Sequence, residues 1–183
     1  MKSIGLPVFL VGLMGSGKSH IAQHWSSQWN VPYIDTDAAI VQRTNKSIAE
    51  IFSVDGETFF RQLEADFIRG IDLYANPVIA TGGGLACFHD NMNWMATHGI
   101  VVWLNPSVDT LILRLWMGRH HRPLIASANT KDELRIILEK KLAERKQFYQ
   151  KAQVHWHESI LEEQIIHQCL NIVQQWKRDQ AIG

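Results

Sequence analysis

The chain has 183 residues and a mass of 20.9 kDa, which fits one domain, and its 46% hydrophobic content is enough for a sizeable core. Eighteen basic residues balance eighteen acidic ones, which argues against a protein that binds nucleic acids or anionic membranes, because both normally carry a basic excess. Cys87 and Cys169 lack the spacing of a zinc site or a disulfide framework, so we expect two reduced thiols.

The first predicted element is a strand at residues 8–11, inside an apolar run that extends from residue 4 to residue 14. This run has no small-residue cleavage site and is too short to span a membrane. It leads directly into a glycine-rich segment, which favours a buried strand. We therefore expect a cytoplasmic protein.

Residues 12–19, GLMGSGKS, match the phosphate-binding motif GxxxxGK[ST] in full, between the first strand and a predicted helix at residues 18–29. Glycines let the backbone point several N–H groups into one concavity, and the start of the helix adds a positive dipole end. We expect Lys18 to reach the β- and γ-phosphates of ATP and the Ser19 hydroxyl to ligate Mg²⁺. The expected ATP contacts in this part of the chain are Gly15, Ser16, Gly17, Lys18, Ser19 and His20.

The second predicted strand, at residues 33–34, is followed by Asp35, Thr36 and Asp37. Ligand groups gather at the carboxyl ends of strands in α/β sheets. Two carboxylates one residue apart suit a divided task, in which Asp35 holds the water shell of Mg²⁺ and Asp37 accepts a proton from a hydroxyl nucleophile. The alternative is a turn in which an aspartate only caps the next helix.

Helices are predicted at residues 47–53 and 57–74, and the second one carries Arg61 and Glu64. Residues three positions apart are neighbours on a helix, so this pair is either a surface ion pair or part of a site. In the functional interpretation, Arg61 is a bidentate clamp for a substrate carboxylate and Glu64 holds it in place. Phe59 and Phe60 are expected in the core.

The third predicted strand, at residues 78–81, runs into Gly82, Gly83 and Gly84. Three consecutive glycines are entropically unfavourable, and a plain turn needs only one or two of them. We interpret the triplet as a place where the backbone approaches a bound substrate closely.

The remaining predicted elements are strands at residues 100–104 and 154–156 and helices at residues 107–117, 132–151 and 160–176. Residues 118–130 form an irregular segment with a basic first half, which is typical of a functional lid. Arg122 on this segment can close over ATP, stabilise the transferred phosphoryl group and exclude water. A solvated surface position is the alternative for Arg122 and for Arg145 on the following helix.

Short apolar runs alternate with helical stretches along the chain, and no internal repeat is visible. Most of the predicted strands are continuous apolar runs, as expected for strands buried on both faces. This pattern predicts a single α/β domain, residues 1–183, with a parallel sheet covered by helices.

In chain order, the motifs GLMGSGKS, YIDTD, SIAEIF, GETFFRQLE, ATGGG, RPL and ERKQFY resemble the succession found in shikimate kinases. The first motif is generic, whereas the joint occurrence of the others over about residues 5–150 is specific. The resemblance implies a three-layer P-loop NTPase fold with a five-stranded parallel sheet in the order 2-3-1-4-5. It also implies a mobile lid at about residues 118–130 and a shikimate-binding helical region at about residues 36–64.

The same resemblance implies transfer of the ATP γ-phosphate to the 3-hydroxyl of shikimate, a step of aromatic amino acid biosynthesis, with Mg²⁺ as the cofactor. The expected catalytic residues are then Lys18, Asp37 and Arg122, and the expected Mg²⁺ ligands are Ser19 and, through water, Asp35. The expected shikimate-binding residues are Asp37, Arg61, Gly82, Gly83, Gly84 and Arg145, with Glu64 in support. We expect a monomer whose partners are ATP and shikimate, without nucleic acid or membrane.

Two other functions stay open on the sequence. A kinase of another small polyol acid, such as a gluconate kinase relative, would use the same paired arginines and Asp37. An ATP-binding module without catalysis is the other possibility. The combination of Lys18, Asp35, Asp37 and Arg122 argues against it, since a mere binder has no use for acceptor chemistry.

The adenine contacts are also open. The shikimate kinases usually carry an arginine seven positions before the lid arginine, and this chain has Leu115 there. Arg114, Arg119 and residues 158–162 are the candidates for these contacts.

Overall fold

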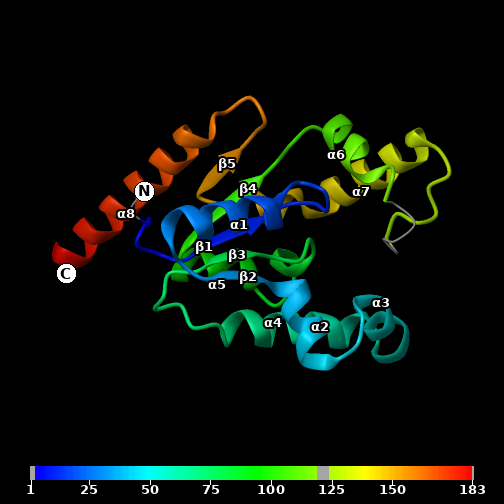
Figure 1. The fold of residues 1–183 in the computed structure, drawn as a ribbon, viewed down its shortest axis with the longest axis horizontal. Coiled ribbons are helices and arrows are strands. Elements are labelled where there is room, and N and C mark those ends of the chain that lie inside the picture. Colours follow the sequence, from blue (N-terminus) through cyan, green and yellow to red (C-terminus); the bar gives the residue numbers. More distant parts are fainter. Residues whose placement is uncertain (1–2, 119–123, 183) are drawn as a thin grey trace.

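The structure is a computed structural model that describes residues 3–118 and 124–182. Its centre is a parallel five-stranded sheet with the strand order β2-β3-β1-β4-β5 (Figure 1). The strands are β1 (Val8–Val11), β2 (Tyr33–Asp35), β3 (Val78–Ala80), β4 (Ile100–Leu104) and β5 (Val154–Trp156). The order confirms the predicted sheet, and β1 lies in the middle, where the phosphate-binding loop leaves it.

Both faces of the sheet are buried. Along β1, Val8 and Leu10 face one core and Phe9 and Val11 face the other, as the two-residue repeat of a strand requires. Helices α1 (Lys18–Trp29) and α8 (Glu162–Ile182) close the first core. The second core is closed by α4 (Glu57–Arg69), α5 (Asn91–His98), α6 (Val108–Leu115) and α7 (Lys131–Tyr149). The molecule therefore has the three layers that the sequence predicts.

A smaller group of elements lies beside α4 and away from α8 (Figure 1). It consists of α2 (Thr36–Thr44), α3 (Ile48–Glu50) and the π-helical turn η1 (Ile51–Asp55). Ile40, Ile51 and Phe60 form its own buried cluster. These elements occupy the region in which the sequence resemblance implies substrate-binding helices.

Helix α8 has 21 residues and packs only one side on the sheet. Its buried face includes Ile165, Cys169 and Val173, while the positions between them are mostly exposed. Among the described residues, no helix is both long enough and apolar enough to cross a membrane.

Several elements differ from the sequence prediction. The helices α2 and α5 are not predicted, and the predicted helix at residues 47–53 is α3 followed by η1. The predicted helix at residues 57–74 ends at Arg69, because Gly70 terminates it with its N–H bonded to two carbonyls of the last turn. Phe59, expected in the core, has 48% of its surface exposed, whereas Phe60 is buried.

Candidate active site

The phosphate-binding loop connects β1 to α1, which is the context that its motif requires. Gly15 and Gly17 adopt φ angles of 76° and 101°, in the left-handed region that favours glycine. Helix α1 begins directly after Gly17, so the positive end of its dipole lies at the loop.

The Lys18 side chain is buried against this loop. Its Nζ donates to the carbonyl oxygens of Gly12 and Leu13, at 2.9 Å each, and lies 3.5 Å from Ser16 Oγ. These contacts hold the ammonium group at the loop itself, where a bound phosphate would need a cation.

Asp35 ends β2 and leads into α2. Its Oδ1 accepts from the backbone N–H groups of Asp37 and Ala38, at 3.1 and 3.2 Å, and so caps the helix. Its Oδ2 accepts from Ser19 Oγ at 2.6 Å. The helix cap and the contact with the phosphate-binding segment therefore coexist, one on each oxygen of the carboxylate.

Arg61 and Glu64 on α4 form a buried ion pair, so the alternative of a surface ion pair is wrong. The side chains are 8% and 1% exposed, and Arg61 Nη1 lies 2.6 Å from Glu64 Oε2. The other edge of the guanidinium donates to Glu57 Oε1 at 2.9 and 3.1 Å. Three phenyl rings lie 4.5–5.6 Å from the guanidinium carbon, those of Phe52, Phe60 and Phe88. Arg61 is thus fixed on several sides, two of them by Glu57 and Phe88, which were not among the residues predicted for the site.

Arg145 on α7 is 8% exposed and is therefore not a solvated surface charge. Its Nη1 donates to the Gly83 carbonyl oxygen at 2.9 Å, and Tyr149 donates its hydroxyl to the same oxygen. Tyr149 belongs to the motif ERKQFY but was not among the residues predicted for the site. Its position four residues after Arg145 places both on one helix face, which was the available signal.

The glycine triplet makes room for the charged side chains of the site. A Cβ at Gly82 would lie 2.5 Å from Asp37 Oδ1 and 2.7 Å from Glu64 Oε1, and a Cβ at Gly84 would lie 2.6 Å from Arg61 Nη1. Such distances are too short for any real Cβ. The glycine backbone therefore lies close to the charged side chains of the site, whereas the sequence prediction was a close approach to a bound substrate.

A cavity of about 530 Å³ brings the expected acceptor residues together. Its lining includes Asp37, Arg61, Glu64, Gly83, Gly84 and Arg145. Gly82 lies outside this lining, and its N–H donates to Thr36 Oγ1 at 2.8 Å. Side chains 37, 61 and 145 thus meet at one cavity, although they belong to α2, α4 and α7.

Two carboxyl groups of this cavity have raised pKa values. Burial, followed by repulsion from Asp35, raises the pKa of Asp37, while Lys18 and Arg61 act in the opposite direction. Burial raises the pKa of Glu64 to about 7, against the opposing charge of Arg61. Glu64 Oε1 is also buried without a hydrogen-bond partner among residues 3–118 and 124–182, which disfavours the charged form further.

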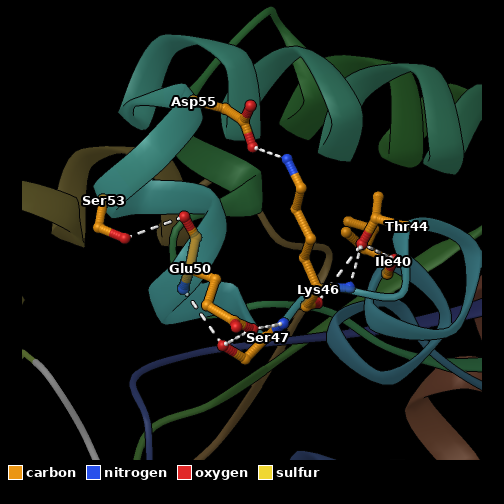
Figure 2. A network of polar contacts seen from close by, with 7 residues as sticks. All are labelled: Ile40, Thr44, Lys46, Ser47, Glu50, Ser53 and Asp55. Carbon is orange, nitrogen blue, oxygen red and sulfur yellow. Dashed lines mark hydrogen bonds and ion pairs between the residues drawn. The ribbon is translucent and has the colours of Figure 1, made fainter.

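One wall of the cavity is formed by α3 and η1, and a polar network holds this wall together (Figure 2). Lys46 Nζ donates to Asp55 Oδ2 at 2.7 Å and so connects the two ends of the segment. Ser47 and Glu50 form a capping box at the start of α3, and Ser53 Oγ donates to the Glu50 carbonyl oxygen at 3.1 Å. The network lies within the segment that carries Ile48, Ala49 and Phe52 into the cavity lining.

A second cavity, of about 490 Å³, borders the other part of the phosphate-binding loop. Ser16, Gly17 and His20 line it, whereas Met14 of the same loop lines the first cavity. The phosphate-binding loop therefore contributes to both cavities. Four residues that we expected to bind ATP or Mg²⁺ line neither cavity: Gly15, Lys18, Ser19 and Asp35.

Arg122 and Arg119 lie outside the described residues, so their expected roles stay predictions. Further along the predicted lid, Ile125 and Ala128 are buried in the core. Leu124 lines the first cavity. Residues 124–130 are therefore attached to the domain next to the acceptor cavity.

Comparisons with known proteins agree on one family. The family model described as shikimate kinase matches residues 14–174 of the chain. A shikimate kinase from Bacteroides thetaiotaomicron is 37% identical over 85% of this chain and 89% of its own length. A shikimate kinase from Parabacteroides distasonis is 35% identical over 90% of this chain and 95% of its own length.

Solved structures give the same result. The crystal structure of shikimate kinase from Bacteroides thetaiotaomicron superposes with a TM-score of 0.78 over 94% of this chain and 98% of that one, at 35% identity. A shikimate kinase from Acinetobacter baumannii, solved in complex with shikimate, gives a TM-score of 0.73 over 94% of this chain and 91% of that one, at 25% identity. A gluconokinase from Sinorhizobium meliloti, at 15% identity and a TM-score of 0.56 over 100% and 98% of the two chains, shares the fold alone.

Proposed function

The chain belongs to the shikimate kinase family, and on this premise we propose that it transfers the γ-phosphate of ATP to the 3-hydroxyl of shikimate, giving shikimate 3-phosphate and ADP. The observation that carries the proposal is the position of the phosphate-binding loop between two cavities. Met14 lines the cavity that contains Asp37, and Ser16 and Gly17 line the other. A loop that holds the transferred phosphate has to border both the acceptor and the nucleotide.

The first cavity is the proposed acceptor site. Shikimate is a small anion with one carboxylate and three hydroxyls, so its binding requires cations, an acceptor for hydroxyl protons and polar backbone. Arg61 and Arg145 are proposed to hold the carboxylate, because both guanidinium groups are buried and line the cavity. Asp37 and the backbone of Gly82, Gly83 and Gly84 are proposed to contact the remainder of the molecule, and Glu64 supports Arg61.

Asp37 is proposed as the general base. As the 3-hydroxyl oxygen attacks the γ-phosphorus, Asp37 accepts its proton, and the bond between the γ-phosphorus and the bridging oxygen breaks to release ADP. The raised pKa of Asp37 suits this role, since a carboxylate with a higher pKa accepts a proton more readily. Lys18 is proposed to stabilise the negative charge that develops on the β- and γ-phosphates of ATP during the transfer.

Mg²⁺ fits the oxygen donors where the start of α1 meets the end of β2. Ser19 Oγ and Asp35 Oδ2 lie 2.6 Å apart, and hard oxygen atoms of this kind are the ligands that Mg²⁺ prefers. We propose that Ser19 ligates the ion directly and that Asp35 holds its water shell. When bound, the ion supplies charge neutralisation on the phosphate oxygens.

The rest of the proposal concerns the nucleotide and the surroundings. Gly15, Ser16, Gly17, Lys18, Ser19 and His20 are the proposed ATP contacts, and Arg122 is proposed to cover ATP from the lid at residues 118–130. The partners are proposed to be the small molecules ATP and shikimate, bound by a monomer. A cytoplasmic location is supported by Cys87 and Cys169, which are both unpaired.

A coupled assay of ADP release with ATP, Mg²⁺ and shikimate tests the proposal. We expect shikimate-dependent turnover, and Asp37→Asn should lower kcat by about 10²- to 10⁴-fold without loss of ADP binding. Asp66→Asn is the matched control, because this aspartate is exposed on α4 and its side chain accepts a hydrogen bond only from Gln62 within the described contacts. Turnover with gluconate but not with shikimate would show that the acceptor is a different one. ADP binding without phosphate transfer to any acceptor would refute the proposal that the protein is a kinase.

A further inference from the structure

The second cavity is enclosed mainly by apolar side chains. Besides the phosphate-binding loop, its wall includes Leu104, Pro106, Trp156 and Ile160, while Arg114 and Glu158 are its charged lining residues. A planar heteroaromatic ring is the kind of group that such a wall accepts, because its faces are apolar and its edge is polar. Trp156 is the largest of these apolar groups, at the end of β5.

Trp156 is held in one orientation. Its indole N–H donates to the Ile160 carbonyl oxygen at 3.0 Å. Its ring stacks on the fully buried Trp25, with a centroid distance of 5.7 Å and an angle of 7° between the planes. Trp25 in turn donates its indole N–H to Glu162 Oε1 and packs on Trp29. The part of the Trp156 ring that lines the cavity is thus preorganised by groups behind it.

Arg114 approaches the same cavity from α6. Its Nη1 donates to the carbonyl oxygens of Gly15 and Ser16, both at 3.2 Å, so the guanidinium is attached to the phosphate-binding loop. A fixed aromatic ring and a fixed planar cation therefore line one cavity next to the place where phosphates would bind.

From this geometry we infer that Trp156 is the aromatic platform on which the nucleotide base rests, and that it determines affinity for the base rather than for the phosphates. The inference rests on the proposed function, in which ATP binds at the phosphate-binding loop. It extends that function by assigning the contact with the base to Trp156 at the end of β5. Stacking of a base on an aromatic side chain is worth about 10- to 100-fold in affinity. Arg114 positions the loop edge of the same cavity.

The test separates base from phosphate. ADP and inorganic tripolyphosphate are titrated calorimetrically into the parent protein, into Trp156→Leu and into Trp156→Phe. We expect Trp156→Leu to weaken ADP binding about 10-fold or more, Trp156→Phe to recover most of the loss, and tripolyphosphate binding to stay within about twofold in all three.

Trp94→Leu is the matched control. Trp94 is also partly buried, but it packs on Phe9 in the other core, so ADP binding should be unchanged. Nucleotide-dependent quenching of tryptophan fluorescence should persist in Trp94→Leu and diminish in Trp156→Phe, a readout that a loss of general stability would not reproduce.

Three results would overturn the inference. The first is unchanged ADP affinity in a folded Trp156→Leu, and the second is an equal loss for ADP and tripolyphosphate. The third result applies if Trp156→Leu does not fold: ADP would then quench the tryptophan fluorescence of Trp156→Phe as strongly as that of the parent protein. The proposed function fails separately: ADP affinity that depends on Trp156, without phosphate transfer to shikimate, would refute the acceptor assignment and leave the base platform standing.

Discussion

The replacement Gly84→Ala tests whether the glycine triplet shapes the acceptor site. Gly84 has φ −99° and ψ −16°, which alanine adopts without strain, so the added methyl group acts only through the space it fills. That methyl carbon would lie 2.6 Å from Arg61 Nη1, and ordinary contact begins at 3.4 Å. The guanidinium therefore has to move by about 0.8 Å, away from a geometry fixed by Glu57 and Glu64.

The magnitude follows from this displacement. A misplacement of roughly 1 Å in a positioning group can lower activity by about 10²-fold. We expect the KM for shikimate to rise about 10- to 100-fold, which corresponds to about 1.4–2.7 kcal/mol, and the KM for ATP to change by less than about twofold. Gly83→Ala should have a smaller effect, since its Cβ would lie 3.2 Å from Arg145 Nη1.

Steady-state kinetics with each substrate varied in turn measure these constants, and thermal unfolding checks that the variants are folded. Gly70→Ala is the matched control at the far end of α4, with its Cβ 3.3 Å from a backbone oxygen and no contact with the site. A folded Gly84→Ala with the parent KM for shikimate would show that Arg61 is not positioned by the glycine turn, or does not bind the substrate.

Two further predictions concern the same cavity. Because burial raises the pKa of Glu64 from 4.5 to about 7, the folded state binds this proton more tightly than the unfolded state, and the group stabilises the fold less as pH rises from 4.5 to 7. The unfolding free energy of Glu64→Gln relative to that of the parent should therefore increase between pH 5 and pH 8, by up to about 3 kcal/mol, with a corresponding rise in relative Tm. A difference that stays constant with pH would contradict burial as the cause of the raised pKa. Lys46→Met removes the half-exposed pair with Asp55 and should raise the KM for shikimate by at most about fivefold. Asp55→Asn should do the same and add nothing to Lys46→Met in the double variant, while fully additive effects would show that the pair does not hold the wall.

The strands were predicted from the sequence because most of them are continuous apolar runs, and the strand order was implied by the resemblance to shikimate kinases. Helix α1 was predicted with its observed bounds, since the phosphate-binding motif fixes where it begins. Helix α2 was not predicted as an element because Asp35 and Asp37 were interpreted as a pair of carboxylates with a chemical task, and an aspartate that caps a helix was given only as the alternative. Helix α5 was missed because it buries only one narrow side, with Met92 and Met95, and its first residue follows Asp90 without a side-chain cap.

The candidate acceptor site was predicted as a set of residues but not as a geometry. The adjacency of β2 and β3 brings Asp37 and Gly82 together, and this follows from the strand order. The contacts that fix Arg61, by contrast, depend on side-chain orientations in α4 and η1 and on Phe88, which directly follows η2 (Leu85–Cys87). The pattern of the sequence does not contain that information, so Glu57, Phe88 and Tyr149 became visible only in the structure.

The bifunctional carboxylate of Asp35 has a consequence for how this protein can evolve. One oxygen secures the first turn of α2 and the other meets Ser19, so the folding of α2 and the proposed role of Asp35 at the Mg²⁺ site depend on one side chain. Even glutamate, one methylene longer, would have to satisfy both partners from a displaced position. Position 35 is therefore expected to tolerate drift far less than a residue that serves the reaction alone, and loss of activity in its variants cannot be ascribed to the metal without a measurement of α2.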